Sequence, residues 1–409
     1  MTIVLFWIAF GLLIYLYVGY PIVAWVRARL ASDDTNVLAA DEPLVTVVIV
    51  VHNEEDRIGS RLENLLTLDY PRQKLEVVVA SDGSTDSTVA RAREYVEAGV
   101  RTRAFADRRG KAAVLSDVIP TARGEIVVLA DARQRFEPGA VRALVRNFGE
   151  PCVGAVSGEL TLTPAGNGAT LGRGASFYWR YETFIRRSES RASSTVGATG
   201  AIYAIRRRLF EPIPRDTILD DVLIPLRIVR RGYRVKLESA ARAYDQTPPT
   251  ERDEFIRKVR TIAGTFQLFS RERWLFNPLR NRLWFETMSH KALRLAAPVL
   301  QLALFSANVG LVDLLLYRSF LVAQMLFYAA ALAGHARRHR RHRLYLLTVP
   351  YTMCLLNWAT IIGFSRFLSG RQQVTWEKAC APARPWPGTV SHLSPPRSPN
   401  QPTGVMPSQ

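Results

Sequence analysis

Long apolar runs without charged side chains lie at both ends of this 409-residue chain, and they constrain its fold more than any other feature. The first 26 residues hold no charged side chain. Residues 3–26 are long enough to cross about 30 Å of hydrocarbon as a helix. A signal peptide would have a basic start and a shorter apolar stretch. The sequence therefore predicts an uncleaved membrane anchor over residues 1–28.

A second membrane region is predicted over residues 292–368, as about three helices. Its apolar runs cover 295–316, 320–334 and 344–364, with a break at Tyr317 and Arg318. The segment 335–343 carries five arginines in nine residues, which marks a cytoplasmic loop by the positive-inside rule. The Pro- and Ser-rich residues 381–409 are predicted to be a disordered tail.

The positive-inside rule also sets the orientation of the chain. Arg27 and Arg29 follow the first apolar run and are expected in the cytoplasm, like the loop 335–343. Four spans then place the amino terminus outside, the central domain in the cytoplasm and the carboxyl terminus outside. The side of the carboxyl terminus stays open, because residues 365–376 fit an interfacial helix equally well. The predicted location is the inner cell membrane, with several passes.

The charge balance bears on possible partners. Lys and Arg number 54 against 36 Asp and Glu, for a formal net charge of +18. Arginine binds phosphates and anionic lipid headgroups, although coding bias also enriches it. No helix-turn-helix, zinc-knuckle or RNP-like pattern accompanies the charge, so no nucleic-acid partner is expected. Three cysteines are too few for a disulfide framework or a four-thiolate zinc site.

The central part of the chain alternates short apolar runs with helix-period segments, which is typical of a parallel α/β sheet. Strands are predicted over 44–51, 75–80 and 125–130. Polar or acidic residues follow each of them, in the segments 52–55, 81–84 and 131–133. Open α/β sheets bind ligands at the carboxyl ends of their strands. A single such acid is most often a helix cap, but three converging acidic loops indicate a ligand site.

Four motifs in this order resemble those of family 2 glycosyltransferases, in the membrane-bound, cellulose-synthase-like branch. They are VTVVIVVHNEE at 45–55, ASDGSTDST at 80–88, RGKA at 109–112 and LADAR at 129–133. The resemblance implies a GT-A fold, the Rossmann-like fold of nucleotide-diphospho-sugar transferases, over residues 40–285. It also implies transfer from a nucleotide sugar with inversion at the anomeric carbon. No GxGxxG or Walker lysine motif offers a different nucleotide site.

The resemblance assigns roles to residues of the donor site. Glu54 and Asp82 match contacts to the nucleotide base and ribose, and Lys111 matches a Gly-Lys element near the nucleotide. Asp131 matches the first acid of the metal-binding Asp-x-Asp, which implies a divalent cation, Mg²⁺ or Mn²⁺. Arg133 stands in place of the second acid. Because arginine cannot ligate a cation, either Asp131 alone supplies the carboxylate or Arg133 replaces part of the charge of the metal.

The acceptor side contains the acidic pair Asp220 and Asp221, after a Gly-bearing segment at 198–205. Inverting transfer needs a base that takes the proton of the acceptor hydroxyl. A neighbouring carboxylate and partial burial both raise the pKa of a carboxyl group. By the resemblance, Asp221 is the catalytic base. The alternative, two acids at a helix amino terminus, is compatible with that role.

Arg257 and Arg260 lie three residues apart, where processive members of the family carry Gln-x-x-Arg-Trp, which this chain lacks. On one helix face they are predicted to contact the leaving diphosphate, or else to rest on anionic lipid. Nearby, an aromatic face at 178–184 is predicted to pack on the membrane spans.

These observations predict a membrane-anchored inverting glycosyltransferase of polysaccharide biosynthesis in the cell envelope. The expected donor is a UDP-sugar, and the expected acceptor is a glycan or a lipid-linked sugar. An alternative is a catalytically silent, glycosyltransferase-like scaffold subunit of a polysaccharide export complex. Arg133 favours the silent subunit, whereas the intact pair of Asp220 and Asp221 opposes it.

Overall fold

The computed structural model describes residues 1–31, 42–163, 173–246, 251–337 and 345–373. Most of the predicted basic loop, residues 338–343, and the predicted tail, residues 381–409, lie outside the described residues. The described chain belongs to one unit, which extends from Met1 to Ala379.

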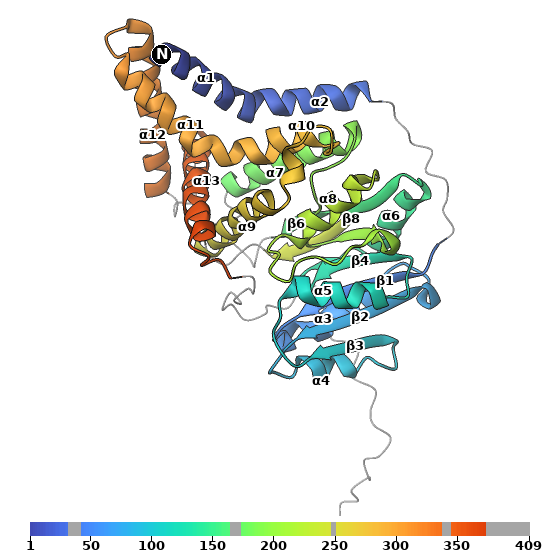
Figure 1. Ribbon diagram of the computed structural model, residues 1–409. Helices are drawn as coiled ribbons and strands as arrows, with labels where there is room; N and C mark the ends of the chain where they lie inside the picture. The colour runs from blue at the N-terminus through green and yellow to red at the C-terminus, as the bar shows by residue number, and fades with distance from the viewer. Residues whose placement is uncertain (32–41, 164–172, 247–250, 338–344, 374–409) are drawn as a thin grey trace, which may run out of the picture. The chain divides into compact units, whose positions relative to one another are not determined.

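Four parallel strands form one half of the sheet (Figure 1). They are β1 (Val45–Val51), β2 (Leu75–Asp82), β3 (Val100–Phe105) and β4 (Ile126–Asp131). Runs of valine and isoleucine are buried on both faces in β1, β2 and β4, as expected for strands covered by helices on each side. In the register, Val50 lies beside Asp131 and Val51 lies beside Ser81. The carboxyl ends of the three predicted strands therefore meet at one edge of the sheet.

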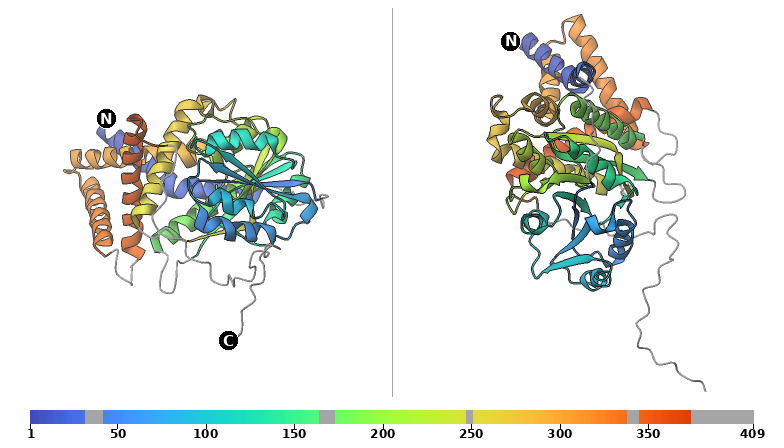
Figure 2. Two further views of the ribbon diagram at one scale, coloured as in Figure 1. Left: turned by 90° about the horizontal axis from the view of Figure 1, so that it is seen from below. Right: turned by 90° about the vertical axis from the view of Figure 1, so that its right-hand side faces the viewer.

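Helices cover both faces of these strands, as the right-hand view of Figure 2 shows. On one face, α3 (Glu55–Leu66) buries Ile58, Leu62 and Leu65 against β1 and β2. On the other face, α5 (Lys111–Val118) buries Ala112 and Leu115. The two apolar clusters pack the helices onto both faces of the sheet, and this packing fixes the strands from which the strand-end loops extend.

The other half of the sheet is mixed, so the prediction of a parallel sheet is right only for β1 to β4. β7 (Tyr203–Arg206) runs antiparallel to β4, and β6 (Val153–Thr163) runs antiparallel to β7. β8 (Arg234–Gln246) is parallel to β6, and the short β5 (Arg135–Phe136) closes the sheet. The strand order is β3-β2-β1-β4-β7-β6-β8-β5. Among these strands, the second half of β8 alternates buried and partly exposed residues, a pattern that does not specify strand direction.

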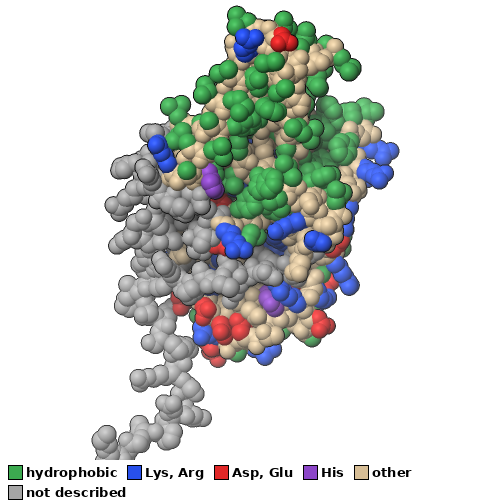
Figure 3. All heavy atoms as spheres, turned by 90° about the vertical axis from the view of Figure 1, so that its left-hand side faces the viewer, with side chains coloured by type: hydrophobic (Ala, Val, Ile, Leu, Met, Phe, Trp, Pro, Cys, Tyr) green, Lys and Arg blue, Asp and Glu red, His purple; other side chains and the backbone are tan. Residues whose placement is uncertain are grey.

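Among the described residues, four helices are long and apolar enough to cross a membrane. They span Thr2–Leu30, Trp284–Gly310, Leu315–Ala336 and Leu346–Leu368. Large apolar side chains on them are exposed, and Figure 3 shows hydrophobic side chains gathered over this part of the molecule. This number of spans and the apolar surface support a membrane location.

Two details of the membrane helices differ from the sequence-based prediction. The break between the second and third spans lies at residues 311–314, and α12 (Leu315–Ala336) continues through Tyr317 and Arg318. Arg318 donates its Nε–H to the carbonyl of Val312 at 3.1 Å. The guanidinium thus satisfies a carbonyl of the turn, and the helix continues through this residue. In addition, α13 (Tyr345–Leu368) includes the first residues of the predicted interfacial segment.

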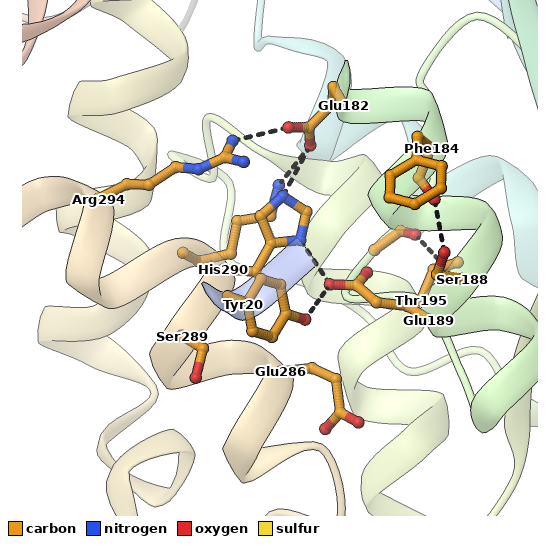
Figure 4. Close-up of polar contacts among 12 residues, drawn as sticks. Tyr20, Glu182, Phe184, Ser188, Glu189, Thr195, Glu286, Ser289, His290 and Arg294 are labelled. Carbon is orange, nitrogen blue, oxygen red and sulfur yellow. Dashed lines mark hydrogen bonds and ion pairs between the residues drawn. The ribbon is translucent and has the colours of Figure 1, made fainter. Parts of the chain in front are cut away.

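Buried polar contacts join the first membrane-length helix to α7 (Arg173–Ala192), as Figure 4 shows. Tyr20, in α2 (Tyr20–Leu30), donates its hydroxyl to Glu189 at 2.5 Å. His290, in the π-helical turn Thr287–Ala292, lies between two carboxylates of α7, with Nδ1 2.6 Å from Glu189 and Nε2 3.0 Å from Glu182. Arg294 donates to Glu182 at 2.6 Å. Glu189 and His290 are each 1% exposed, so these charges depend on one another.

Aromatic residues of α7 extend the same contact. Tyr181 donates its hydroxyl to the carbonyl of Tyr17 at 3.1 Å and packs in the cluster formed by Tyr20, Ala24 and Ile185. The aromatic face of α7 thus packs on the first membrane-length helix, although Phe184 remains 43% exposed.

Candidate active site at the carboxyl ends of the strands

The loop after β1 and the loop after β2 are joined by hydrogen bonds. The backbone N–H of Thr85 donates to Asn53 Oδ1 at 2.8 Å, and the backbone N–H of Glu54 donates to Thr88 Oγ1 at 2.7 Å. The carboxylate of Glu54 accepts a hydrogen bond from Arg57 at 2.9 Å and is partly exposed. Glu54 is therefore held at the strand edge with its carboxylate within reach of a ligand.

Asp82, the last residue of β2, organises the segment that leads to Lys111. One carboxylate oxygen accepts the backbone N–H of Arg109 at 2.7 Å, and the other accepts that of Gly110 at 2.8 Å. Gly110 has φ +89°, which favours glycine before the helix that begins at Lys111. Gly83 has φ +63°, and a Cβ there would lie 2.5 Å from the backbone nitrogen of Arg108. These two glycines let the segments 82–84 and 107–110 approach each other closely.

Lys111 joins the donor and acceptor sides of the site. Its Nζ lies 2.9 Å from Asp131 Oδ1 and 3.4 Å from Asp220 Oδ2. Burial alone would lower the pKa of Lys111, but Asp131 and Asp220 reverse this effect and raise it above its ordinary value. The lysine is therefore cationic and fixed between two carboxylates that lie 89 positions apart in the sequence.

Asp220 and Asp221 begin α8 (Asp220–Arg230) but have different environments. Asp221 Oδ2 accepts the backbone N–H of Gly200 at 2.9 Å, and its carbonyl accepts that of Ala198 at 2.8 Å. Burial and the neighbouring Asp220 raise the pKa of Asp221 to about 6, although Lys111 acts in the opposite direction. A carboxylate with a pKa near neutrality is suited to accept a proton and release it again.

Arg133 and Asp245 form a second ion pair beside Asp131. Arg133 Nε lies 2.9 Å from Asp245 Oδ2, and Arg133 Nη2 lies 3.7 Å from Asp131 Oδ2. Gln134 donates its side-chain N–H to the same Asp245 oxygen at 3.0 Å. Burial alone would lower the pKa of Arg133, but Asp245 and Asp131 raise it.

The two arginines of α9 (Glu251–Arg271), Arg257 and Arg260, are close enough to these acids to be affected by their charges. Burial lowers the pKa of Arg260, against the opposing effects of Asp220, Asp221 and Asp131. Burial and the charge of Arg133 also lower the pKa of Arg257, against the opposing effect of Asp245. The structure thus gathers Lys111, Arg257, Arg260 and three acids at one place, while Glu54 and Asp82 lie in the adjoining loops.

Several residues near the site are not found by sequence reasoning. Asp245 lies near the end of β8, and only its position just before the Pro-rich segment 247–250 could have indicated a strand end. Tyr203 of β7 is fully buried, and burial together with Asp220 and Asp221 raises its pKa well above its ordinary value. Arg61 of α3 is 3% exposed, with its guanidinium carbon 4.1 Å from the centre of the Phe136 ring. Arg61 also faces Asp131, but nothing local in its helix indicates this.

The residues around Asp131 do not fit a divalent cation. Among the described residues, no group of three His, Cys, Asp or Glu side chains is placed to hold a metal ion. One oxygen of Asp131 pairs with Lys111 and the other faces Arg133. Divalent cations such as Mg²⁺ need several oxygen ligands and are repelled by neighbouring cations.

Comparison with known proteins agrees with this geometry. A family model described as "Glycosyl transferase family 2" matches residues 46–213. A poly-beta-1,6-N-acetyl-D-glucosamine synthase from Staphylococcus aureus (strain MSSA476) is 26% identical over 239 residues, which cover 56% of each chain. A probable glycosyltransferase from Bacillus subtilis (strain 168) is 26% identical over 236 residues, or 54% of this chain and 55% of that protein. This chain thus spans only a little over half the length of these curated relatives.

A solved structure also shares the fold. A mannosyltransferase from Pyrobaculum calidifontis, in complex with GDP-Man and Mn²⁺, aligns with a TM-score of 0.67 and 24% identity, over 90% of this chain and 99% of that chain. The predicted GT-A α/β domain with accompanying apolar helices is confirmed. Residues 46–213 of the chain thus resemble glycosyltransferase family 2 in sequence, and the fold is shared with a solved mannosyltransferase.

Proposed function

We propose that the chain transfers a sugar from a nucleotide-diphosphate donor to a hydroxyl of a glycan or lipid-linked acceptor, with inversion at the anomeric carbon. The observation that carries this proposal is the different environment of the two adjacent acids. Asp220 lies against Lys111, whereas burial and Asp220 raise the pKa of Asp221 to about 6. Such a pair separates a structural carboxylate from a proton acceptor.

In the proposed reaction, Asp221 takes the proton of the acceptor hydroxyl as its oxygen attacks the anomeric carbon. The bond from this carbon to the diphosphate oxygen breaks, and the nucleoside diphosphate leaves with the bonding electrons. Arg257 and Arg260 face the acids from α9 and supply positive charge for the leaving diphosphate. Lys111 holds Asp131 and Asp220 in place during these steps.

The donor site is proposed at the loops after β1 and β2. Glu54 offers a partly exposed carboxylate to the N–H groups of a nucleotide base. Both oxygens of Asp82 already accept backbone N–H groups, so Asp82 contributes mainly by fixing the segment before Lys111. We propose a UDP-sugar as donor, while the solved relative with this fold binds GDP-Man. No step above depends on the divalent cation expected at Asp131, because Lys111 and Arg133 face the two oxygens of that carboxylate.

We further propose an inner-membrane enzyme with four spans and its catalytic domain, residues 40–285, in the cytoplasm. The four apolar helices support several passes, and Arg27 and Arg29 near the end of the first span favour a cytoplasmic domain. A similar polysaccharide synthase among the relatives supports a glycan acceptor of the cell envelope.

The alternative of a silent scaffold subunit rests on Arg133 in place of an acid. The test uses full-length protein purified in detergent, incubated with nucleotide sugars and envelope glycan or lipid-linked acceptors. We expect product with inverted anomeric configuration, and Asp221→Asn should lower the rate by about 10²–10⁴. Unchanged turnover in Asp221→Asn would remove it from the mechanism, and nucleotide binding without any transfer would favour the scaffold.

Thermal unfolding distinguishes loss of the base from loss of folding. A carboxyl whose pKa is raised by folding destabilises the protein as the pH rises from the ordinary aspartate range through about 6. Asp221→Asn removes this penalty, so at pH 7 the variant should be at least as stable as the wild type.

A further inference from the structure

Positive side chains surround Asp131, the residue that the family resemblance assigns to a metal. Lys111 and Arg133 face its two oxygens, and Arg260 also lowers the pKa of its carboxyl group. Arg61 is also near enough to be affected, because burial lowers the pKa of Arg61 to about 9 and the charge of Asp131 opposes this shift. A carboxylate that balances this many cations has little negative potential left to attract a divalent ion.

Arg133 is held in a defined position. Asp245 is 5% exposed and binds Arg133 Nε, while Gln134, which is 2% exposed, donates to the same carboxylate oxygen. A buried carboxylate needs a counter-ion. Asp245 therefore holds Arg133 in place, and Arg133 in turn neutralises Asp245. Arg133 is therefore prearranged and does not sample the rotamers of a surface arginine.

The guanidinium of Arg133 is also accessible. Its side chain is 32% exposed, whereas the side chains of its partners Asp131 and Asp245 are only 10% and 7% exposed. Glu54, in the proposed donor site, also acts on Arg133 through its charge. The arginine thus pairs with two buried acids, is itself partly exposed, and is close enough to Glu54 to be affected by its charge.

We propose that Arg133, held by Asp245 and Asp131, is a built-in cation that binds the diphosphate of the donor in place of a divalent metal. This inference rests on the proposed function, because it assigns a residue to the diphosphate of that same donor. A guanidinium donates parallel N–H bonds to two phosphate oxygens and stays charged at all physiological pH values. In this arrangement Asp245 is a positioning residue that does not touch the donor.

The experiment measures binding of UDP and of GDP by calorimetry, on full-length protein in detergent, with EDTA or with Mn²⁺. In the wild type, we expect the Kd in EDTA to stay within about twofold of that in Mn²⁺, because no metal contributes to binding. Arg133→Gln should weaken binding about tenfold or more under both conditions, since the charged contact is lost. Asp245→Asn should weaken binding less, because the guanidinium remains but is held less firmly.

Arg123→Gln is the matched control. Arg123 lies before the opposite end of the same strand, β4, with its side chain 73% exposed, and its loss should leave the Kd unchanged. Arg133→Asp restores the Asp-x-Asp spacing and should bind nucleotide only with Mn²⁺. A variant that does not fold leaves the chelator comparison in the wild type decisive.

The outcomes separate this inference from the proposed function. Nucleotide binding by the wild type that is lost in EDTA and restored by Mn²⁺ would overturn the role of Arg133 and leave the transferase proposal intact. Binding of neither nucleotide under either condition would overturn both.

Discussion

At the scale of single residues, the site depends on neighbouring carboxylates that have different surroundings. Asp220 and Asp221 are neighbours in the chain, yet Lys111 reaches only the first, and the backbone N–H of Gly200 binds the second. The acidic pair itself is evident in the sequence. Lys111, which gives the two acids different surroundings, lies far from them in the sequence, at the start of α5. Only the folded structure shows its contact with Asp220.

The first prediction concerns pH. Because a base acts only when deprotonated, transfer should fall about tenfold per pH unit below about 6, the pKa to which burial and Asp220 raise Asp221. The measurement is kcat/KM between pH 5 and 8, with nucleotide affinity at each pH as the control. A flat profile over this range would exclude Asp221 as the base.

The second prediction concerns Gly83. Gly83→Ala places a Cβ against the backbone of Arg108 at a φ of +63°, so the loop that carries Lys111 must shift. We expect UDP affinity to fall by about tenfold or more through this displacement. Gly139→Ala, where no atom lies within 4 Å of the added Cβ, is the control and should bind normally. Equal affinity in both variants would show that the close approach of the two loops is dispensable.

At the scale of elements, the sequence predicts the parallel half of the sheet well and the mixed half poorly. Continuous valine and isoleucine runs identify β1, β2 and β4, and each ends within two residues of its predicted boundary. The pairing of β6 with β8 joins segments about 80 residues apart, and no local pattern encodes such a pairing. Asp245 escapes prediction for a similar reason, since its place beside Arg133 follows from the pairing of β8 with β5, in which Tyr244 lies opposite Arg135.

The buried polar contacts between α2, α7 and the turn Thr287–Ala292 are likewise invisible in the sequence. Burial alone would raise the pKa of Glu182, but His290 and Arg294 hold it well below its ordinary range. Glu189 also keeps a lowered pKa, against burial, through His290 and Tyr20. Both glutamates are therefore charged, and the histidine between them is required for their burial.

The third prediction tests this dependence. His290→Ala leaves the buried Glu189 without the imidazole whose Nδ1 lies 2.6 Å from it, which should cost about 3–5 kcal/mol of stability. Thermal unfolding in detergent measures the loss. The double variant Glu189→Gln, His290→Gln removes both charges and should recover much of it. If the single variant unfolds at the wild-type temperature, the ion pair does not hold these helices together.

At the scale of the whole molecule, the number of apolar spans follows from the sequence, and the structure adds how they meet. A Cβ on Gly310 would lie 3.5 Å from Thr2, so the start of the first span lies beside the turn between the second and third. Trp7 also donates its indole N–H to the Tyr317 hydroxyl at 3.2 Å. The start of the first span and the turn between the second and third spans must then lie on the same side of the membrane. This agrees with the predicted topology.

The fourth prediction tests the topology by cysteine labelling in intact cells, in a background without Cys152, Cys354 and Cys380. An impermeant reagent should label a cysteine at Val312, in the outer turn, and should not label one at Ser60 in α3. Both positions are in the described chain, so a folded variant presents each as the structure shows. Labelling at Ser60 would place the catalytic domain outside, away from cytoplasmic nucleotide sugars.

The contacts of Tyr20, Glu189 and His290 also limit which acceptors can be elongated. They join the first span to α7, in the same unit as the side chains of the proposed active site. These contacts leave no hinge at this point about which the α/β domain could move toward the membrane. In the proposed reaction, the distance of Asp221 from the membrane is then fixed by the protein. An acceptor anchored in the bilayer must then be long enough to bring its terminal hydroxyl to Asp221. The enzyme would therefore select acceptors by their length as well as by their chemical identity.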